Sequence, residues 1–169
     1  MFNLGTPTGE FNGQPWYEDV YRDKGENCHE CGRLLKIYHR RLSRSMVRGM
    51  LRLYRLEMIH PERKFFHVKL FDKEGARGEF GVVSSWGLTT AQPNDTLGKK
   101  ASGYWCLTEF GRRFILLREK VPQYVVLKWG SELLGFSGPM VDAKECLEQE
   151  NQFDYDELMA WTPEEQELF

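Results

Sequence analysis

One arginine-striped amphipathic segment constrains this chain more than any other part of its sequence. Apolar side chains recur between Leu42 and Tyr54 at the spacing of one helix face, and Ser43 stands where a helix N-cap is expected. The pair His60-Pro61 ends the segment, because a residue before proline disfavours helical backbone. The sequence therefore predicts an amphipathic helix over residues 44–59. Its other face carries four arginines, Arg44, Arg48, Arg52 and Arg55.

Charge is strongly segregated along the chain, although the net charge is only −2. Residues 31–56 carry eight basic and no acidic side chains, whereas residues 142–169 carry one basic and ten acidic ones. A basic block favours a surface that faces phosphate, and an acidic end favours a solvated or partner-binding segment. The alternative is that the acidic end neutralises the basic face within the same molecule.

Composition excludes several classes of protein. The 169 residues, of which 41% are hydrophobic, suffice for one globular domain with appendages. No apolar run approaches the roughly 20 residues of a membrane span, and the first residues lack the features of a signal peptide. Four cysteines are too few for a disulfide scaffold. We therefore expect a cytoplasmic protein with no membrane partner.

The remaining patterns predict an α+β fold. The expected strands are residues 33–40, residues 103–107 and residues 121–129, the last interrupted at Pro122, with residues 133–136 as its hairpin partner. The further expected helices are residues 77–88 with Gly87 at the C-cap, residues 109–118 capped by Thr108, and residues 142–150 and 154–161. Residues 89–102 are expected to be a polar loop.

The middle of the chain resembles the MarR-like and related winged-helix families. In those families the recognition helix ends with a Gly-Leu pair, a hairpin wing follows, and an aromatic–x–Leu–Thr–x–x–Gly run leads into the last helix. Here the pair is Gly87-Leu88, and the run is Trp105-Cys106-Leu107-Thr108-Glu109-Phe110-Gly111. The resemblance covers roughly residues 43–118. It implies a winged helix-turn-helix core, a fold that serves in DNA binding and also in protein interaction.

The whole chain is also similar to small bacteriophage-encoded proteins that have no assigned activity. The similarity includes the opening Cys-x-x-Cys-Gly motif at residues 28–32 and the closing segment Phe153–Leu158. It implies a viral source, and therefore the cytoplasm of a host cell as the location.

A winged-helix core would contact DNA through its basic helix, its recognition helix and its wing. Arginine and lysine suit phosphate contacts, which position a protein on the duplex. The expected recognition helix, residues 77–88, offers few side chains of the kinds that favour base contacts. The residues expected at the interface are Arg44, Arg48, Arg52, Arg55, Arg77, Ser84, Lys99, Lys100 and Arg112.

The motif Cys28-His29-Glu30-Cys31-Gly32 has the spacing of a zinc knuckle. Zinc takes four ligands, and the chain contains no second Cys-x-x-Cys. His60 and His67 are the residues expected to complete a structural Cys2His2 site. Two alternatives stay open, which are a metal-free turn with buried thiols and a redox-active pair.

Catalytic motifs are absent from the sequence: it has no P-loop, no His-Glu-x-x-His and no Gly-x-Ser-x-Gly. We therefore expect a non-enzymatic, winged-helix regulator of transcription that binds double-stranded DNA, with a homodimer as an option. The alternative is a protein-interaction module on the same fold that modulates a host defence or transcription protein.

Four segments are expected to pack as one compact unit. They are an N-terminal arm with the knuckle at residues 1–42, the winged-helix core at 43–120, a β-hairpin at 121–141 and an acidic helical tail at 142–169.

Overall fold

The computed structural model describes residues 10–11, 14–15, 26–27, 32, 34–73, 79–94, 102–128, 132–148 and 155–163. They belong to two compact units, of which one joins Met1–Arg41 with Pro122–Met140 and the other joins Leu42–Val121 with Val141–Phe169. Helices and strands are mixed, so the expected α+β class is confirmed. The structure therefore groups the predicted N-terminal arm with the predicted β-hairpin over 121–141, and the predicted winged-helix core with the acidic tail.

The first unit contains a three-stranded sheet in the order β10–β9–β5. Its strands are β5 (Ile37–Arg41), β9 (Val121–Lys128) and β10 (Glu132–Val141). β5 runs antiparallel to β9, with Ile37 opposite Lys128 and Arg41 opposite Tyr124. Two short antiparallel pairs also belong to this unit, β1 (Glu10–Phe11) with β2 (Gln14–Pro15) and β3 (Glu26–Asn27) with β4 (Leu34–Leu35).

The expected interruption at Pro122 is wrong. β9 continues through this proline, which is buried. The pairing with β5 begins only at Tyr124, so the amide hydrogen that proline lacks is not needed on that side.

The second unit is organised around α2 (Arg44–Ile59), and the predicted helix is confirmed at both ends. The Ser43 hydroxyl accepts a hydrogen bond from the Met46 amide at 3.3 Å, and His60 is the C-cap. The apolar face of α2 is buried from Met46 to Leu56, whereas Met58 and Ile59 at its C-terminal end are exposed. Gly49 lets another element approach closely, because a Cβ there would lie 3.1 Å from Cε2 of Phe80.

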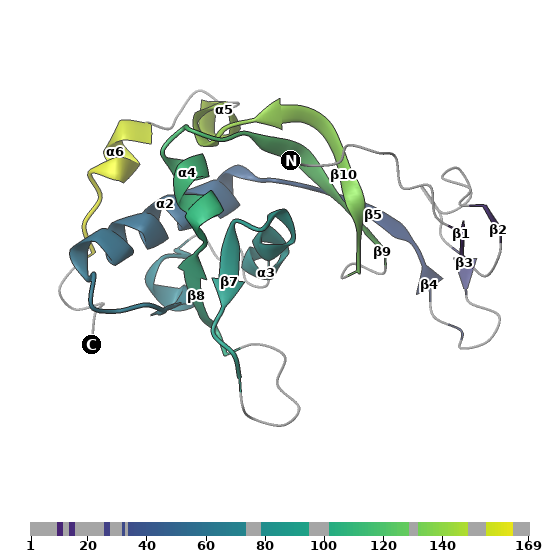
Figure 1. The fold of residues 1–169 in the computed structure, drawn as a ribbon, viewed down its shortest axis with the longest axis horizontal. Coiled ribbons are helices and arrows are strands. Elements are labelled where there is room, and N and C mark those ends of the chain that lie inside the picture. The colour runs from purple at the N-terminus through teal and green to yellow at the C-terminus, as the bar shows by residue number, and fades with distance from the viewer. Residues whose placement is uncertain are drawn as a thin grey trace. The chain divides into compact units, whose positions relative to one another are not determined.

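A three-stranded antiparallel sheet of order β6–β8–β7 packs beside α2 (Figure 1). Its strands are β6 (Phe66–His67), β7 (Thr89–Ala91) and β8 (Tyr104–Leu107). Trp105 in β8 pairs with Phe66 on one side and with Ala91 on the other. The expected loop over 89–102 is therefore wrong at residues 89–91, where pairing with β8 outweighs the polar, turn-like local sequence.

The expected helix over 77–88 is shorter and has two parts, α3 (Phe80–Val83) and the 3-10 turn η2 (Ser84–Trp86). A further 3-10 turn, η1 (Val68–Leu70), follows β6. Phe80 packs against Phe71 and Trp105, with ring centroids 4.8 and 5.7 Å apart. Gly87 ends η2 in the left-handed conformation at φ 71°, as predicted.

The two motifs that carry the winged-helix resemblance meet in one junction. The Thr108 hydroxyl donates to the Gly87 carbonyl at 2.6 Å and accepts from the Gly111 amide at 2.9 Å. The Thr108 amide donates to the Leu88 carbonyl at 3.0 Å. Thr108 therefore caps α4 (Glu109–Ile115), as predicted, and ties it to the end of η2. The expected helix end at residue 118 is wrong, because Leu117 has a positive φ of 60°.

The acidic end of the chain contributes two short helices, α5 (Ala143–Glu148) and α6 (Tyr155–Met159), which both pack against α2. Asp142 and Glu145 cap α5 reciprocally, each side chain accepting from the other's amide. The Tyr155 hydroxyl donates to the carbonyl of Ile115, at the end of α4. The apolar side chains buried by the two helices are Ala143, Cys146, Leu147 and Leu158. No helix in the described ranges is long and apolar enough to cross a membrane.

Replacing Gly111 tests the junction. A Cβ at this position would lie 1.9 Å from the carbonyl oxygen of Leu88, and both atoms belong to backbone that cannot move freely. We expect Gly111→Ala to lower the free energy of unfolding by about 3 kcal/mol or more, measured by chemical denaturation.

The matched control is Gly81→Ala on α3. A Cβ at Gly81 meets nothing within 4 Å, so this change is expected to be neutral or to stabilise by up to about 1 kcal/mol. Equal stabilities of the two variants would contradict the close approach of α4 to Leu88.

Candidate functional site

Arg52 and Arg55, both predicted to contact DNA from α2, donate hydrogen bonds to backbone carbonyls of the second unit. Arg52 Nη1 donates to the carbonyl of Phe71 at 3.4 Å, and Arg55 Nε donates to the carbonyl of Trp161 at 3.1 Å. Arg44 and Arg48 are half-buried. The guanidinium groups of Arg52 and Arg55 therefore serve packing within the second unit, and they are poorly placed to be the main contacts to a duplex.

The predicted contacts around the hairpin are only partly described. Ser84 is exposed, but its hydroxyl donates to the Gly81 carbonyl at 2.6 Å. Arg77, Lys99 and Lys100 lie outside the described residues. On the hairpin itself Thr90 is exposed, and Tyr104 is 41% exposed with its ring edge-to-face with that of His67. The described part of the hairpin therefore exposes small polar and aromatic groups.

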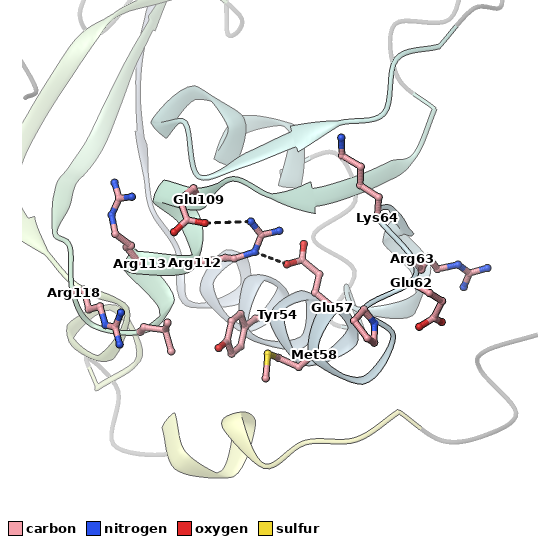
Figure 2. A pocket seen from close by; sticks show the side chains of 12 residues that line it. Tyr54, Glu57, Met58, Glu62, Arg63, Lys64, Glu109, Arg112, Arg113 and Arg118 are labelled. Carbon is pink, nitrogen blue, oxygen red and sulfur yellow. Dashed lines mark hydrogen bonds and ion pairs between the residues drawn. The ribbon is translucent and has the colours of Figure 1, made fainter.

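A pocket of about 460 Å³ lies in the second unit, between the C-terminal half of α2, residues 61–64 and α4 (Figure 2). Of the predicted DNA contacts that the structure describes, only Arg112 lines it. Tyr54, Met58, Pro61 and Leu116 supply its uncharged lining. Its charged lining residues are Glu57, Glu62, Arg63, Lys64, Glu109, Arg112, Arg113 and Arg118.

Glu57 holds one side of this pocket together. One carboxylate oxygen accepts from the Leu107 amide at 2.8 Å, and the other accepts from Nε of Arg112 at 3.0 Å. Arg112 lies between two carboxylates, because its Nη1 is 3.7 Å from Glu109 (Figure 2). The Glu57 side chain is only 11% exposed. It therefore joins α2 to β8 and α4 by charge-assisted hydrogen bonds.

Burial raises the pKa of Glu57 above its ordinary value of 4.5, because removing water penalises the charged form. The Leu107 amide and Arg112 act in the opposite direction and do not cancel that effect. Burial, with Glu57 nearby, also raises the pKa of the Cys106 thiol. Cys106 is therefore a packed thiol rather than an activated nucleophile.

Sequence reasoning did not identify Glu57. The only signal was that it is the single acidic residue among the 16 residues of α2. One acidic residue near the C-terminus of such an arginine-rich helix indicates a specific partner. It does not balance the positive charge of the helix, and the helix dipole disfavours a negative charge at that end.

The structure describes two of the four predicted zinc ligands, His60 and His67. Cys28 and Cys31 lie outside the described residues. His60 Nδ1 lies 3.3 Å from Glu62, and His67 Nδ1 accepts from the Lys69 amide at 3.3 Å. Among the described residues, no three His, Cys, Asp or Glu side chains are grouped to hold a metal ion. The zinc site stays a prediction.

Comparisons of the chain with protein families, with curated proteins and with solved structures gave no match.

Removing the charge at position 57 has a pH-dependent outcome. A raised pKa means that the folded chain binds this proton more tightly than the unfolded chain, so wild-type stability falls as pH rises from about 4.5 through the raised pKa. The Glu57→Gln variant does not lose stability in this pH range, and its side-chain oxygen can still accept a hydrogen bond from the Leu107 amide. Its stability relative to wild type should therefore rise across that window, measured by denaturation at several pH values.

The control for this prediction is Glu57→Ala, which removes the acceptor as well. It leaves the Leu107 amide unpaired and should cost about 1–3 kcal/mol at neutral pH. A stability difference between wild type and Glu57→Gln that does not vary with pH would contradict the burial effect.

The zinc prediction is tested by elemental analysis of protein purified without added metal. We expect close to one zinc per chain, and none in the double variant Cys28→Ser with Cys31→Ser. The wild-type protein should also melt at a lower temperature after chelation, because a structural zinc contributes folding free energy. Zinc-free wild-type protein with unchanged melting would exclude the knuckle.

Proposed function

We propose that the second unit is a winged-helix domain that binds double-stranded DNA and regulates transcription. The arrangement of the β7–β8 hairpin carries the proposal. The hairpin begins directly after Gly87-Leu88 at the end of η2 and leads directly into α4, which Thr108 caps. This is the succession of recognition helix, wing and last helix that the resemblance implies.

The third strand and the core also support this proposal. β6 completes the sheet on the side of β8 that faces away from β7, so the hairpin is held at its base (Figure 1). Phe80, Val83 and Trp86 are buried beneath the α3–η2 segment. A recognition element anchored in this way presents its opposite face to a ligand.

DNA binding on this face would depend mainly on phosphate contacts. The polar side chains on α3–η2 are serines, and the Ser84 hydroxyl is already engaged with Gly81. Base contacts that favour arginine, lysine, asparagine and glutamine are therefore few there. Lys99 and Lys100, at the predicted wing tip, and Arg77, before α3, are the cations that flank this face in sequence. Binding should accordingly be strongly salt-dependent.

A protein-interaction role on the same fold is the second candidate. The internal partners of Arg52 and Arg55 favour it, because they remove two guanidinium groups from the predicted phosphate-facing stripe. Such a module would use the same unit without strong affinity for DNA.

The test is DNA binding by the full chain over a salt series, with random duplex DNA. The double variant Lys99→Glu with Lys100→Glu should weaken binding at least about tenfold and reduce the slope of log affinity against log salt by about 2. The matched control is Lys144→Glu on α5, an exposed lysine paired only with Glu148 in the described part of the chain. It should leave affinity unchanged. Absence of binding at physiological salt would favour the protein-interaction role.

A further inference from the structure

Three cations of the pocket between α2 and α4 have no carboxylate within ion-pair distance among the described residues. They are Arg63, Lys64 and Arg118. Arg63 lies over the ring of Phe66 at 5.8 Å, and Lys64 lies over that of Phe65 at 5.4 Å. The other two pocket arginines are paired, Arg112 with Glu57 and Arg113 with Glu119. The pocket therefore has uncompensated positive charge at its edge.

The same pocket exposes apolar surface. Met58 is 57% exposed, and Tyr54 and Leu116 are half-buried. Three carboxylates, those of Glu57, Glu62 and Glu109, also line it and would repel a dense anion such as a phosphate cluster. Spaced cations around apolar side chains, with acceptors for peptide amides, instead fit an extended peptide that carries acidic groups and an apolar end.

The chain itself has such a peptide within reach. The last described residues pass along α2, where the Trp161 carbonyl is bonded to Arg55. Arg55 adjoins Tyr54 in the pocket wall and precedes Met58 by three residues, a rise of about 4.5 Å. The six residues after Pro163 are Glu-Glu-Gln-Glu-Leu-Phe. Fully extended, they span up to about 20 Å.

We propose that this pocket is a peptide-binding site and that residues 164–169 of the same chain are its ligand. The three glutamates of the segment supply the anions that Arg63, Lys64 and Arg118 lack, and its Leu-Phe pair supplies apolar groups for Met58 and Leu116. The tether sets an effective concentration of the order of millimolar, so weak contacts suffice. This inference goes beyond the proposed DNA binding and does not depend on it.

A photo-crosslinking experiment on the full chain tests the proposal. Phe169 is replaced by the photoreactive analogue p-benzoylphenylalanine, the protein is irradiated when dilute, and the crosslinked peptides are identified by mass spectrometry. The proposal predicts crosslinks within one chain to the segments that contain Met58 and Leu116. Crosslinks confined to other segments, or formed only between chains, would overturn it.

Charge reversal at the pocket edge provides a second readout. Lys64→Glu combined with Arg118→Glu should lower the crosslink yield at Met58 and Leu116 at least about threefold, and high salt should do the same. Replacing Glu164 and Glu165 by lysine in that variant should restore the yield. The matched control is Lys69→Glu, an exposed lysine on η1 outside the pocket, which should not alter it. Yields that are equal in all these variants would overturn the proposal.

Discussion

The second unit depends on the junction at which Thr108 meets Gly87 and Leu88. One hydroxyl both donates to the end of η2 and accepts from the first turn of α4, while the threonine amide binds the next carbonyl. Gly111 lets the helix lie against the Leu88 carbonyl, where any larger residue would collide with backbone. Because the hairpin β7–β8 starts and ends at this junction, its base is fixed at both strands.

Glu57 fixes the same region from the side of α2. Its carboxylate joins the long helix to the last residue of β8 and to Arg112 on α4, so three elements meet at one buried charge. Burial disfavours the charged form of Glu57. A substitution at this position can preserve stability only if the new side chain still accepts a hydrogen bond from the Leu107 amide. The acidic end of the chain is held against the second unit by hydrogen bonds to backbone carbonyls. Arg55 on α2 donates to the Trp161 carbonyl, and Tyr155 on α6 donates to the Ile115 carbonyl. Arg52, Arg55 and Glu57 of α2 therefore all have hydrogen-bond partners within the same chain.

Local signals predicted much of this unit. Ser43, Gly87 and Thr108 act through their nearest neighbours in sequence, and each has the capping role that its residue type favours. Elements that depend on partners distant in sequence were harder to predict. Residues 89–91 become a strand only because β8 lies beside them, and β9 tolerates Pro122 on the side of β5 because the pairing with β5 begins only at Tyr124.

The site was predicted less well than the fold. An arginine stripe on a helix indicates a charged face, but periodicity does not reveal whether solvent, DNA or protein covers that face. Arg52 and Arg55 find carbonyls in segments 19 and 106 residues away in sequence, which no local pattern encodes. Glu57 was missed for the same reason, since its importance comes from Leu107 and Arg112 rather than from its own helix.

Hydrogen exchange of the full chain with and without duplex DNA tests the central claim most directly, because it maps the surface that DNA covers. The account predicts slower exchange in α3–η2 and in the residues joining β7 to β8, with unchanged exchange in the pocket segments 54–64 and 112–118. Protection confined to those pocket segments, or no protection anywhere at a DNA concentration that saturates binding, would contradict it.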